Sequence, residues 1–244
     1  MRASDYEREE LAMRTMRLTF AVMVAALWIV GTAQLSAVAA AADAGAPAMS
    51  PAQALAQLVA GNQRFQRDTT GHPHLYAKRR AELAGGQAPF AVILSCSDSR
   101  VPPELIFDQG LGDLFVVRVA GNTVTPAGLE SIDYAVDHLG TNLIMVLGHE
   151  SCGAVKGALG ECVSKPAAKL PEIFANICPA VEQARKAGGD TLESSAIDLN
   201  VTDQVKILER SPLFKKRIAD GSLKIVGARY NLKSGKVEII NSGD

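Results

Sequence analysis

The sequence has almost no net charge, and this balance excludes several classes of protein. Its 25 Lys and Arg residues nearly match its 26 Asp and Glu residues, so the net charge is −1 over 244 residues. No basic excess indicates a nucleic-acid partner, and no acidic tail is present. Internal repeats and signs of a second folded domain are also absent. The remaining composition, 48% hydrophobic, is that of one globular α/β core.

Cysteine is scarce, and no two cysteines have the C-x-x-C spacing of thiol redox proteins, which argues against that class. The four cysteines are Cys96, Cys152, Cys162 and Cys178. In an oxidising compartment cysteines are expected to pair unless a metal holds them. Two states stay open for Cys162 and Cys178, a mutual disulfide or a pair of buried free thiols.

No apolar run is long enough to span a bilayer comfortably, which takes roughly 20 residues. Residues 18–30 form a shorter run after two arginines, and residues 37–39 fit an A-x-A cleavage pattern. We predict that residues 1–40 are a signal peptide and that the protein is exported, in a bacterium to the periplasm, with no membrane association after leader cleavage. An uncleaved N-terminal anchor is the alternative, and translation starting at Met13 or Met16 would shorten the leader.

Residues 41–49 are rich in Ala, Gly and Pro and are predicted to be a linker, which leaves residues 50–244 as the one folded domain. Ser50 and Gln53 form an S-x-x-Q capping box, which predicts a helix from Pro51 onward. Its apolar stripe must bury against something, and a neighbouring subunit would suit it. The stripe consists of Leu55, Leu58, Val59 and Phe65.

Three short apolar runs predict strands that are buried on both faces, as in a parallel sheet. They are residues 91–94, 114–119 and 143–147. A helix is predicted over 125–139, with Thr125 as its cap and Gly140 as its stop. Residues 68–88 are polar and are expected to be irregular. Further helices are predicted at 152–159, 170–186 and 193–209, and a closing hairpin at 223–230 and 236–240.

The first of these strands ends in an unusual set of side chains. Cys96, Asp98 and Arg100 follow it at every second position, and His149 and Cys152 follow the third strand as an H-x-x-C pair. In open parallel sheets, sites form beyond the carboxyl ends of strands, where the strand order reverses. The two groups would converge if their strands flank that point.

Two thiolates and one imidazole are ligands that suit Zn²⁺, which prefers four ligands in a tetrahedron. Three protein ligands with one open position are typical of a catalytic zinc site. Water or Asp98 would take the fourth position. The alternatives are a Cys96–Cys152 disulfide, and a plain surface ion pair for Asp98 and Arg100.

These residues resemble the motifs of the β-class carbonic anhydrases. The resemblance lies in C-x-D-x-R and H-x-x-C and extends through GNQRF, CSDSRVPPELIFDQGLGDLFVVRVAGN and IDYAVDHLG. It covers residues 52–157 strongly and the terminal strands more loosely. It implies a short, mainly parallel β-sheet with an antiparallel C-terminal edge strand, flanked by helices, and an N-terminal helical arm.

The resemblance also implies roles for the residues. Cys96, His149 and Cys152 would bind one zinc ion, and Asp98 with Arg100 would be the catalytic dyad. Zinc makes hydroxide available near neutral pH, and Asp98 would orient that zinc-bound hydroxide toward CO₂. In a closed state, which the sequence permits, Asp98 would leave Arg100 and become the fourth ligand.

Five further residues fall at substrate-binding positions by resemblance: Gln87, Phe115, Ala120, Tyr134 and Gly153. Gln87, together with Ile93 where gated members have Trp, favours the plant-like, open-site subtype. In the family, the Gln, Phe and Tyr come from the neighbouring subunit, so we expect a homodimer or tetramer through the N-terminal arm and the sheet.

The sequence thus predicts a zinc enzyme that interconverts CO₂ and bicarbonate. One rival is a hydrolase of carbon disulfide or carbonyl sulfide on the same fold. Another is a non-catalytic zinc- or bicarbonate-binding module, against which the Asp98–Arg100 pair argues. The proton shuttle is open, with His72, His74 and His138 as candidates.

Overall fold

The structure, a computed structural model, describes residues 49–162, 171–188 and 191–241. These residues lie in one unit, Pro47–Asp244. The predicted signal peptide, residues 1–40, and nearly all of the linker lie outside the described residues. Among the helices that are described, none has the length and hydropathy needed to cross a membrane.

The described residues form a five-stranded sheet in the order β2-β1-β3-β4-β5. Strands β2, β1, β3 and β4 are parallel, and β5 pairs antiparallel with β4 through the predicted hairpin. This confirms the predicted fold class. The strands are β1 (Ala91–Ser95), β2 (Leu114–Arg118), β3 (Leu143–His149), β4 (Lys224–Tyr230) and β5 (Val237–Asn241).

Strands β1 and β3 are fully buried along their length, as their continuous apolar runs predict. Strand β2 is only half-buried, so the prediction that it is covered on both faces is wrong for this strand. The reason is its place at the edge of the sheet, which the run of apolar residues does not reveal. The strand order reverses between β1 and β3, because β2 lies on the far side of β1.

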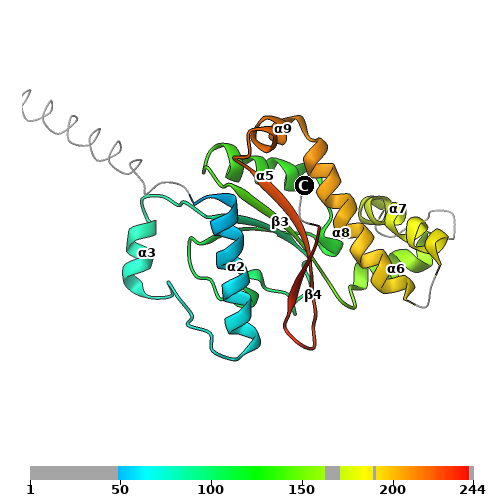
Figure 1. The fold of residues 1–244 in the computed structure, drawn as a ribbon, viewed down its shortest axis with the longest axis horizontal. Helices are drawn as coiled ribbons and strands as arrows, with labels where there is room; N and C mark the ends of the chain where they lie inside the picture. The colour runs from blue at the N-terminus through cyan, green and yellow to red at the C-terminus, as the bar shows by residue number, and fades with distance from the viewer. Residues whose placement is uncertain (1–48, 163–170, 189–190, 242–244) are drawn as a thin grey trace, which may run out of the picture. The chain divides into compact units, whose positions relative to one another are not determined.

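Helices cover both faces of the sheet. Thr125 caps α5 by accepting a hydrogen bond from the Gly128 N–H, and Gly140 follows the helix at a φ of +71°, as predicted. In Figure 1, α8 runs along β4 with α6 and α7 beyond it, while α2 lies on the other side of β3 and β4. The longer helices are α2 (Pro51–Gln66), α5 (Pro126–Asp137), α6 (Gly153–Glu161), α7 (Pro171–Ala187), α8 (Leu192–Arg210) and α9 (Pro212–Ala219).

Helix α2 has the predicted capping box between Ser50 and Gln53, but its apolar stripe is mostly covered within the chain itself. Leu58 is fully buried, and only Val59 remains well exposed, at 41%. Asn62 fixes the helix by donating to the carbonyls of Ile106 and Gly235. The expectation of an exposed stripe is therefore wrong for most of its residues, because the helix packs on its own sheet.

Residues 68–88 are not wholly irregular, because they contain α3 (Ala77–Leu83). No residue of α3 is buried, so the helix carries no apolar periodicity that could predict it. Two other short elements, α4 (Pro103–Ile106) and the 3₁₀ turn η1 (Ala120–Asn122), are also too short to leave such a signal. A disulfide joins Cys162, which follows α6, to Cys178 in α7.

Candidate metal centre and active site

The structure brings the three predicted metal ligands together. Cys96 follows β1, His149 is the last residue of β3, and Cys152 immediately precedes α6. Their ligand atoms all lie within 4.8 Å of one another, the one such group found among the described residues. The strand register explains why these side chains come together. Strands β1 and β3 are adjacent and Ser95 pairs with Leu147, so both strands end at the same edge of the sheet.

The protonation of His149 leaves one ring nitrogen for a metal. Its Nδ1 lies 2.8 Å from the carbonyl oxygen of Glu150, which can only accept, so Nδ1 carries the proton and donates. Nε2 is buried and has no hydrogen-bond partner. A buried imidazole nitrogen without a partner is costly unless something binds it. Its lone pair and the two sulfur atoms form a donor set that fits zinc.

Cys96 and Cys152 are both buried free thiols, so the alternative of a disulfide between them is not what the structure contains. A hydrogen bond from Cys152 lowers the pKa of Cys96 to about 4. The same contact with Cys96, together with burial, raises the pKa of Cys152. The two sulfurs therefore share one proton, which a divalent cation can displace.

Asp98 and Arg100 form a bidentate pair beside the ligands. Arg100 Nε donates to Asp98 Oδ1 at 2.9 Å and Nη2 donates to Oδ2 at 2.6 Å. The Arg100 guanidinium holds the pKa of the Asp98 carboxyl well below its usual range. Asp98 Oδ2 lies 4.0 Å from His149 Nε2. The dyad thus places an ionised carboxylate next to the metal position and keeps it on Arg100 in this structure.

Arg118 supports this loop, a role that the sequence reasoning missed. Arg118 Nε donates to the Cys96 carbonyl at 3.0 Å, and Nη2 donates to the Asp98 carbonyl at 2.6 Å. A signal was present, because Arg118 is the one charged residue in the apolar run of β2 and lies at its carboxyl end, where sites form.

The predicted substrate-binding residues fall into two groups. Ala120 begins η1 and Gly153 begins α6, so both lie at the carboxyl edge of the sheet with the metal ligands. Gln87 precedes β1, whereas Cys96 follows it, and a strand of five residues spans roughly 16 Å. Phe115 pairs in register with Val92, also toward the amino end of β1.

Phe115 and Tyr134 contact each other, with ring centroids 6.3 Å apart. Tyr134 is 47% exposed. Phe115 packs against a different core cluster from the one that contains Cys96 and Cys152. One chain therefore brings together the metal ligands and the dyad, but it does not bring Gln87, Phe115 and Tyr134 to them.

The three histidines suggested as proton carriers have other partners. His74 Nδ1 lies 2.8 Å from both Asp113 carboxylate oxygens, and His72 Nε2 lies 3.1 Å from Thr70 Oγ1. The His138 ring lies 5.2 Å from the Tyr134 ring. The proton shuttle stays a prediction.

Comparisons with known proteins agree with this site. Residues 91–237 match the family model described as carbonic anhydrase. Carbonic anhydrase 2 of Mycobacterium tuberculosis is 44% identical, over 78% of this chain and 93% of its own length. A carbonic anhydrase of Mycolicibacterium smegmatis is 41% identical, over 79% and 95%.

The fold is likewise similar to solved structures. The β-carbonic anhydrase of Coccomyxa, solved with acetazolamide, has a TM-score of 0.60 and 29% identity, and the match covers 76% of this chain and 85% of that one. With the family model, the relatives and the fold in agreement, the chain belongs to the β-class carbonic anhydrases.

Proposed function

We propose that the protein catalyses the zinc-dependent, reversible hydration of CO₂ to bicarbonate and a proton, with one Zn²⁺ held by Cys96, His149 and Cys152. The observation that carries this proposal is the buried triad, in which His149 Nε2 has no partner and both sulfurs are free. Bound zinc supplies Lewis acidity, which makes a hydroxide nucleophile available near neutral pH.

Asp98 would orient the nucleophile. Because Arg100 keeps the carboxyl ionised, Asp98 can only accept hydrogen bonds. An O–H donor beside the metal position would therefore point its hydrogen at Asp98 and leave a lone pair for the carbon of CO₂. Arg100 also donates to the Ser151 carbonyl at 3.3 Å, which ties the dyad to the loop between His149 and Cys152.

Bicarbonate would be held at the same edge. Gly153 is the first residue of α6, and the N–H groups at a helix N-terminus favour an anion. Ala120 would leave room beside the ligands for a small linear substrate.

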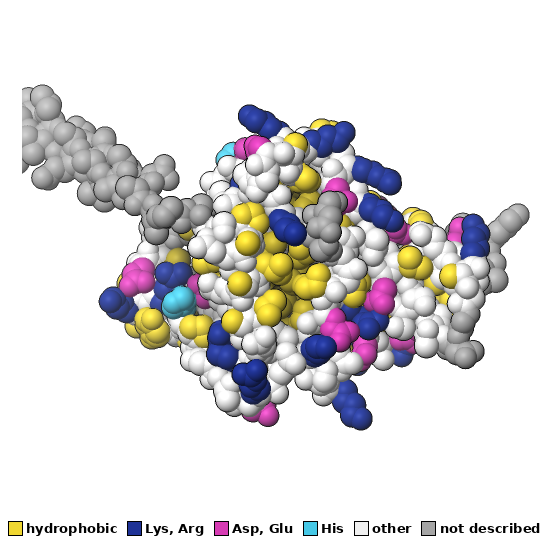
Figure 2. Space-filling view, viewed as in Figure 1, with side chains coloured by type: hydrophobic (Ala, Val, Ile, Leu, Met, Phe, Trp, Pro, Cys, Tyr) yellow, Lys and Arg dark blue, Asp and Glu magenta, His cyan; other side chains and the backbone are white. Residues whose placement is uncertain are grey.

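We also infer that the working enzyme is a homodimer or tetramer, in which Gln87, Phe115 and Tyr134 serve the site of a second copy. Two exposed apolar areas support this. Near β2, Leu105 is 54% and Leu111 is 41% exposed. Figure 2 shows hydrophobic side chains gathered between α2 and the β4–β5 hairpin, where a groove is lined by residues that include Val59, Met145 and Ile239. Such patches are typical of interfaces. We also propose that the enzyme is exported to the periplasm, on the basis of the apolar run and the A-x-A pattern within residues 1–40.

Metal analysis and stopped-flow CO₂ hydration, for wild type and Asp98→Asn, test the catalytic part. We expect about one zinc per chain and activity that rises above pH ~7.5. Asp98 is already a carboxylate far below that pH because its pKa is lowered, so the rise would report the nucleophile. Asp98→Asn should keep its zinc and lose about 100-fold in kcat.

A matched control is Asp203→Asn on α8, which removes a carboxylate that pairs with Lys206 and accepts a hydrogen bond from Gln183 and should leave the rate unchanged. Full activity in Asp98→Asn would contradict the orienting role. A zinc-loaded wild type without CO₂ hydration would favour a non-catalytic module, and turnover of carbonyl sulfide in its place would favour the hydrolase.

A further inference from the structure

Helix α8 carries two buried amide side chains that its packing alone does not require. Asn200 is 1% exposed and Gln204 is fully buried. They are four residues apart, so they lie on the same face of the helix. Burying an amide costs free energy unless its donors and acceptors are paired. The partners of these two side chains therefore indicate what the amides do.

Both amides bind the segment that contains η1. Asn200 Nδ2 donates to the Gly121 carbonyl at 2.9 Å, and the Val124 N–H donates to Gln204 Oε1 at 2.8 Å. Gln204 Nε2 in turn donates to Asn200 Oδ1 at 3.3 Å. The two side chains thus hold the turn at two points and are linked to each other.

The turn reaches a metal ligand. The Gly121 N–H donates to Cys96 Sγ at 3.3 Å. Gly121 has a φ of +68°, and a Cβ there would lie 2.7 Å from Ile177 Cδ1, so neither its conformation nor its space allows another residue without strain. The carbonyl that Asn200 holds and the N–H that faces Cys96 are attached to the same Cα atom, so fixing one restricts the other.

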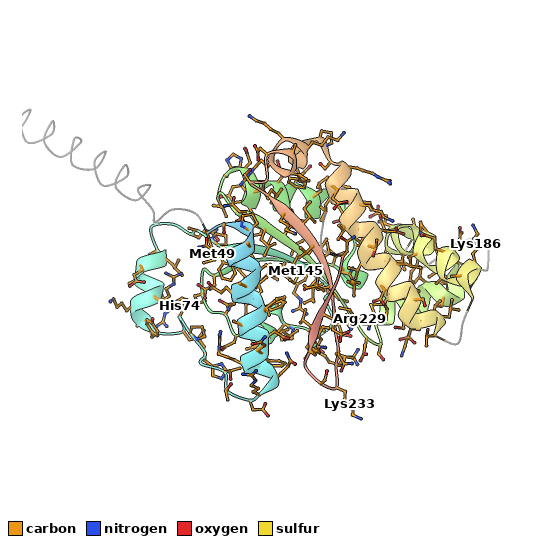
Figure 3. All side chains as sticks on the ribbon, viewed as in Figure 1. Met49, His74, Met145, Lys186, Arg229 and Lys233 are labelled. Carbon is orange, nitrogen blue, oxygen red and sulfur yellow. A yellow bond between two sulfur atoms is a disulfide. The ribbon has the colours of Figure 1, made fainter. Side chains whose placement is uncertain are left out.

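Helix α8 packs unusually close to the sheet at this point. A Cβ at Gly148 would lie 2.4 Å from Val201 Cγ2, and a Cβ at Gly227 would lie 2.8 Å from Val201 Cγ1. Gly148 precedes His149, and Val201 follows Asn200. Arg229, labelled in Figure 3, also ties β4 to α8 by donating to Asp198 Oδ2 at 2.7 Å. Asn200 is therefore on a rigid element with a fixed distance to the turn.

We propose that Asn200, supported by Gln204, is a positioning residue for the metal centre. It holds the Gly121 carbonyl, and this fixes Gly121 so that its N–H points at the Cys96 sulfur. The N–H hydrogen bond then sets how strongly that sulfur donates to the metal. This inference rests on the proposed function, because it assumes that Cys96 is a ligand. Residues that support a ligand in this way typically change metal affinity by about 10- to 100-fold when they are substituted.

The test compares Asn200→Asp, which keeps the size but loses the donor, with Val205→Ala. Val205 is a fully buried residue of the same helix, and its truncation should weaken packing without changing the hydrogen bonds to the turn. Three quantities would be measured: the thermal midpoint, zinc affinity by chelator competition, and the thiolate-to-metal charge-transfer band of the cobalt-substituted protein. We expect Asn200→Asp to lower zinc affinity by about 10- to 100-fold and to shift the band. Val205→Ala should lower the thermal midpoint and keep both metal properties.

Unchanged affinity and band in folded Asn200→Asp would overturn the inference, as would equal losses in Val205→Ala. If Asn200→Asp does not fold, Gln204→Glu takes its place. It keeps the acceptor for Val124 and removes the donor to Asn200. We therefore expect zinc affinity and the charge-transfer band to change in the same direction but by less. Unchanged values of both would again overturn the inference. Failure of the proposed function would look different, because wild type itself would then lack bound zinc or CO₂ hydration.

Discussion

The two ends of strand β1 differ in how much of the active site one chain assembles there. At the carboxyl end, Cys96, His149 and Cys152 are 5%, 1% and 1% exposed, and backbone groups of Gly121 and Glu150 form hydrogen bonds with Cys96 and His149. At the amino end, Gln87 is exposed, and Tyr134 is 47% exposed beside Phe115. The metal half of the site is thus built by a single chain, whereas Gln87 and Tyr134 lie at its surface, where we propose that a second copy meets them.

This difference separates two requirements of the enzyme. Metal binding needs a rigid, buried donor set, and the register of the parallel pair β1–β3 brings Cys96 and His149 to the same edge of the sheet. Substrate binding needs an apolar wall, and we infer that a second copy supplies it. Changes to the three ligands at the carboxyl end should therefore remove the metal, whereas changes at the β2 edge should spare the metal and remove activity.

The largest effect is expected at the carboxyl end. Cys152→Ser removes a sulfur ligand that is almost fully buried, so zinc should be lost and CO₂ hydration should fall by more than about 100-fold, the upper range for residues that only support a ligand. Metal content and stopped-flow rates check this. The double variant Cys162→Ser/Cys178→Ser is a suitable control, because it removes sulfurs that lie outside the site and leaves no unpaired thiol. Normal zinc content in Cys152→Ser would show that the ligand set is different.

A smaller effect is expected at the β2 edge. Leu105→Arg places a charge on a side chain that is 54% exposed and should break the dimer. Zinc content should stay at wild-type level, while activity falls by at least about tenfold because the pocket residues are no longer held at the site. The equally exposed Leu213→Arg on α9, where the leucine is 50% exposed, is the control. Sedimentation and stopped-flow rates check both, and an active monomeric Leu105→Arg would contradict the shared pocket.

The smallest effect on catalysis is expected from the disulfide between α6 and α7. Removing it in the double variant Cys162→Ser/Cys178→Ser should lower the free energy of unfolding by about 3 kcal/mol, because the unfolded chain is no longer constrained. Zinc content and rate should not change, since neither sulfur belongs to the site. Chemical denaturation measures the stability, and a stability equal to that of wild type would show that the bond constrains little.

The sequence predicted the buried strands and the convergence of Cys96, His149 and Cys152 because both depend on local patterns. The apolar runs of β1 and β3 and the residues that follow them determine which side chains emerge at the carboxyl edge. The resemblance to a known family then indicated the sheet and the antiparallel edge strand, which periodicity alone does not specify.

Other features depend on contacts that no local pattern reports. Helix α3 buries nothing, so it had no periodicity to detect, and the half-buried state of β2 follows from its place in the strand order. Leu58 was expected to face a partner but packs on the chain's own sheet. Asn200 was not singled out, because its role comes from a hydrogen bond across 79 residues of sequence to Gly121.

X-ray absorption at the zinc edge of the purified protein tests the ligand set most directly. With Cys96, His149 and Cys152 as ligands, we predict two sulfur atoms at about 2.3 Å, one imidazole nitrogen at about 2.0–2.1 Å, and one further oxygen atom. A zinc shell with no sulfur, or protein free of zinc in which Cys96 and Cys152 are joined as a disulfide, would contradict the assignment of these three residues.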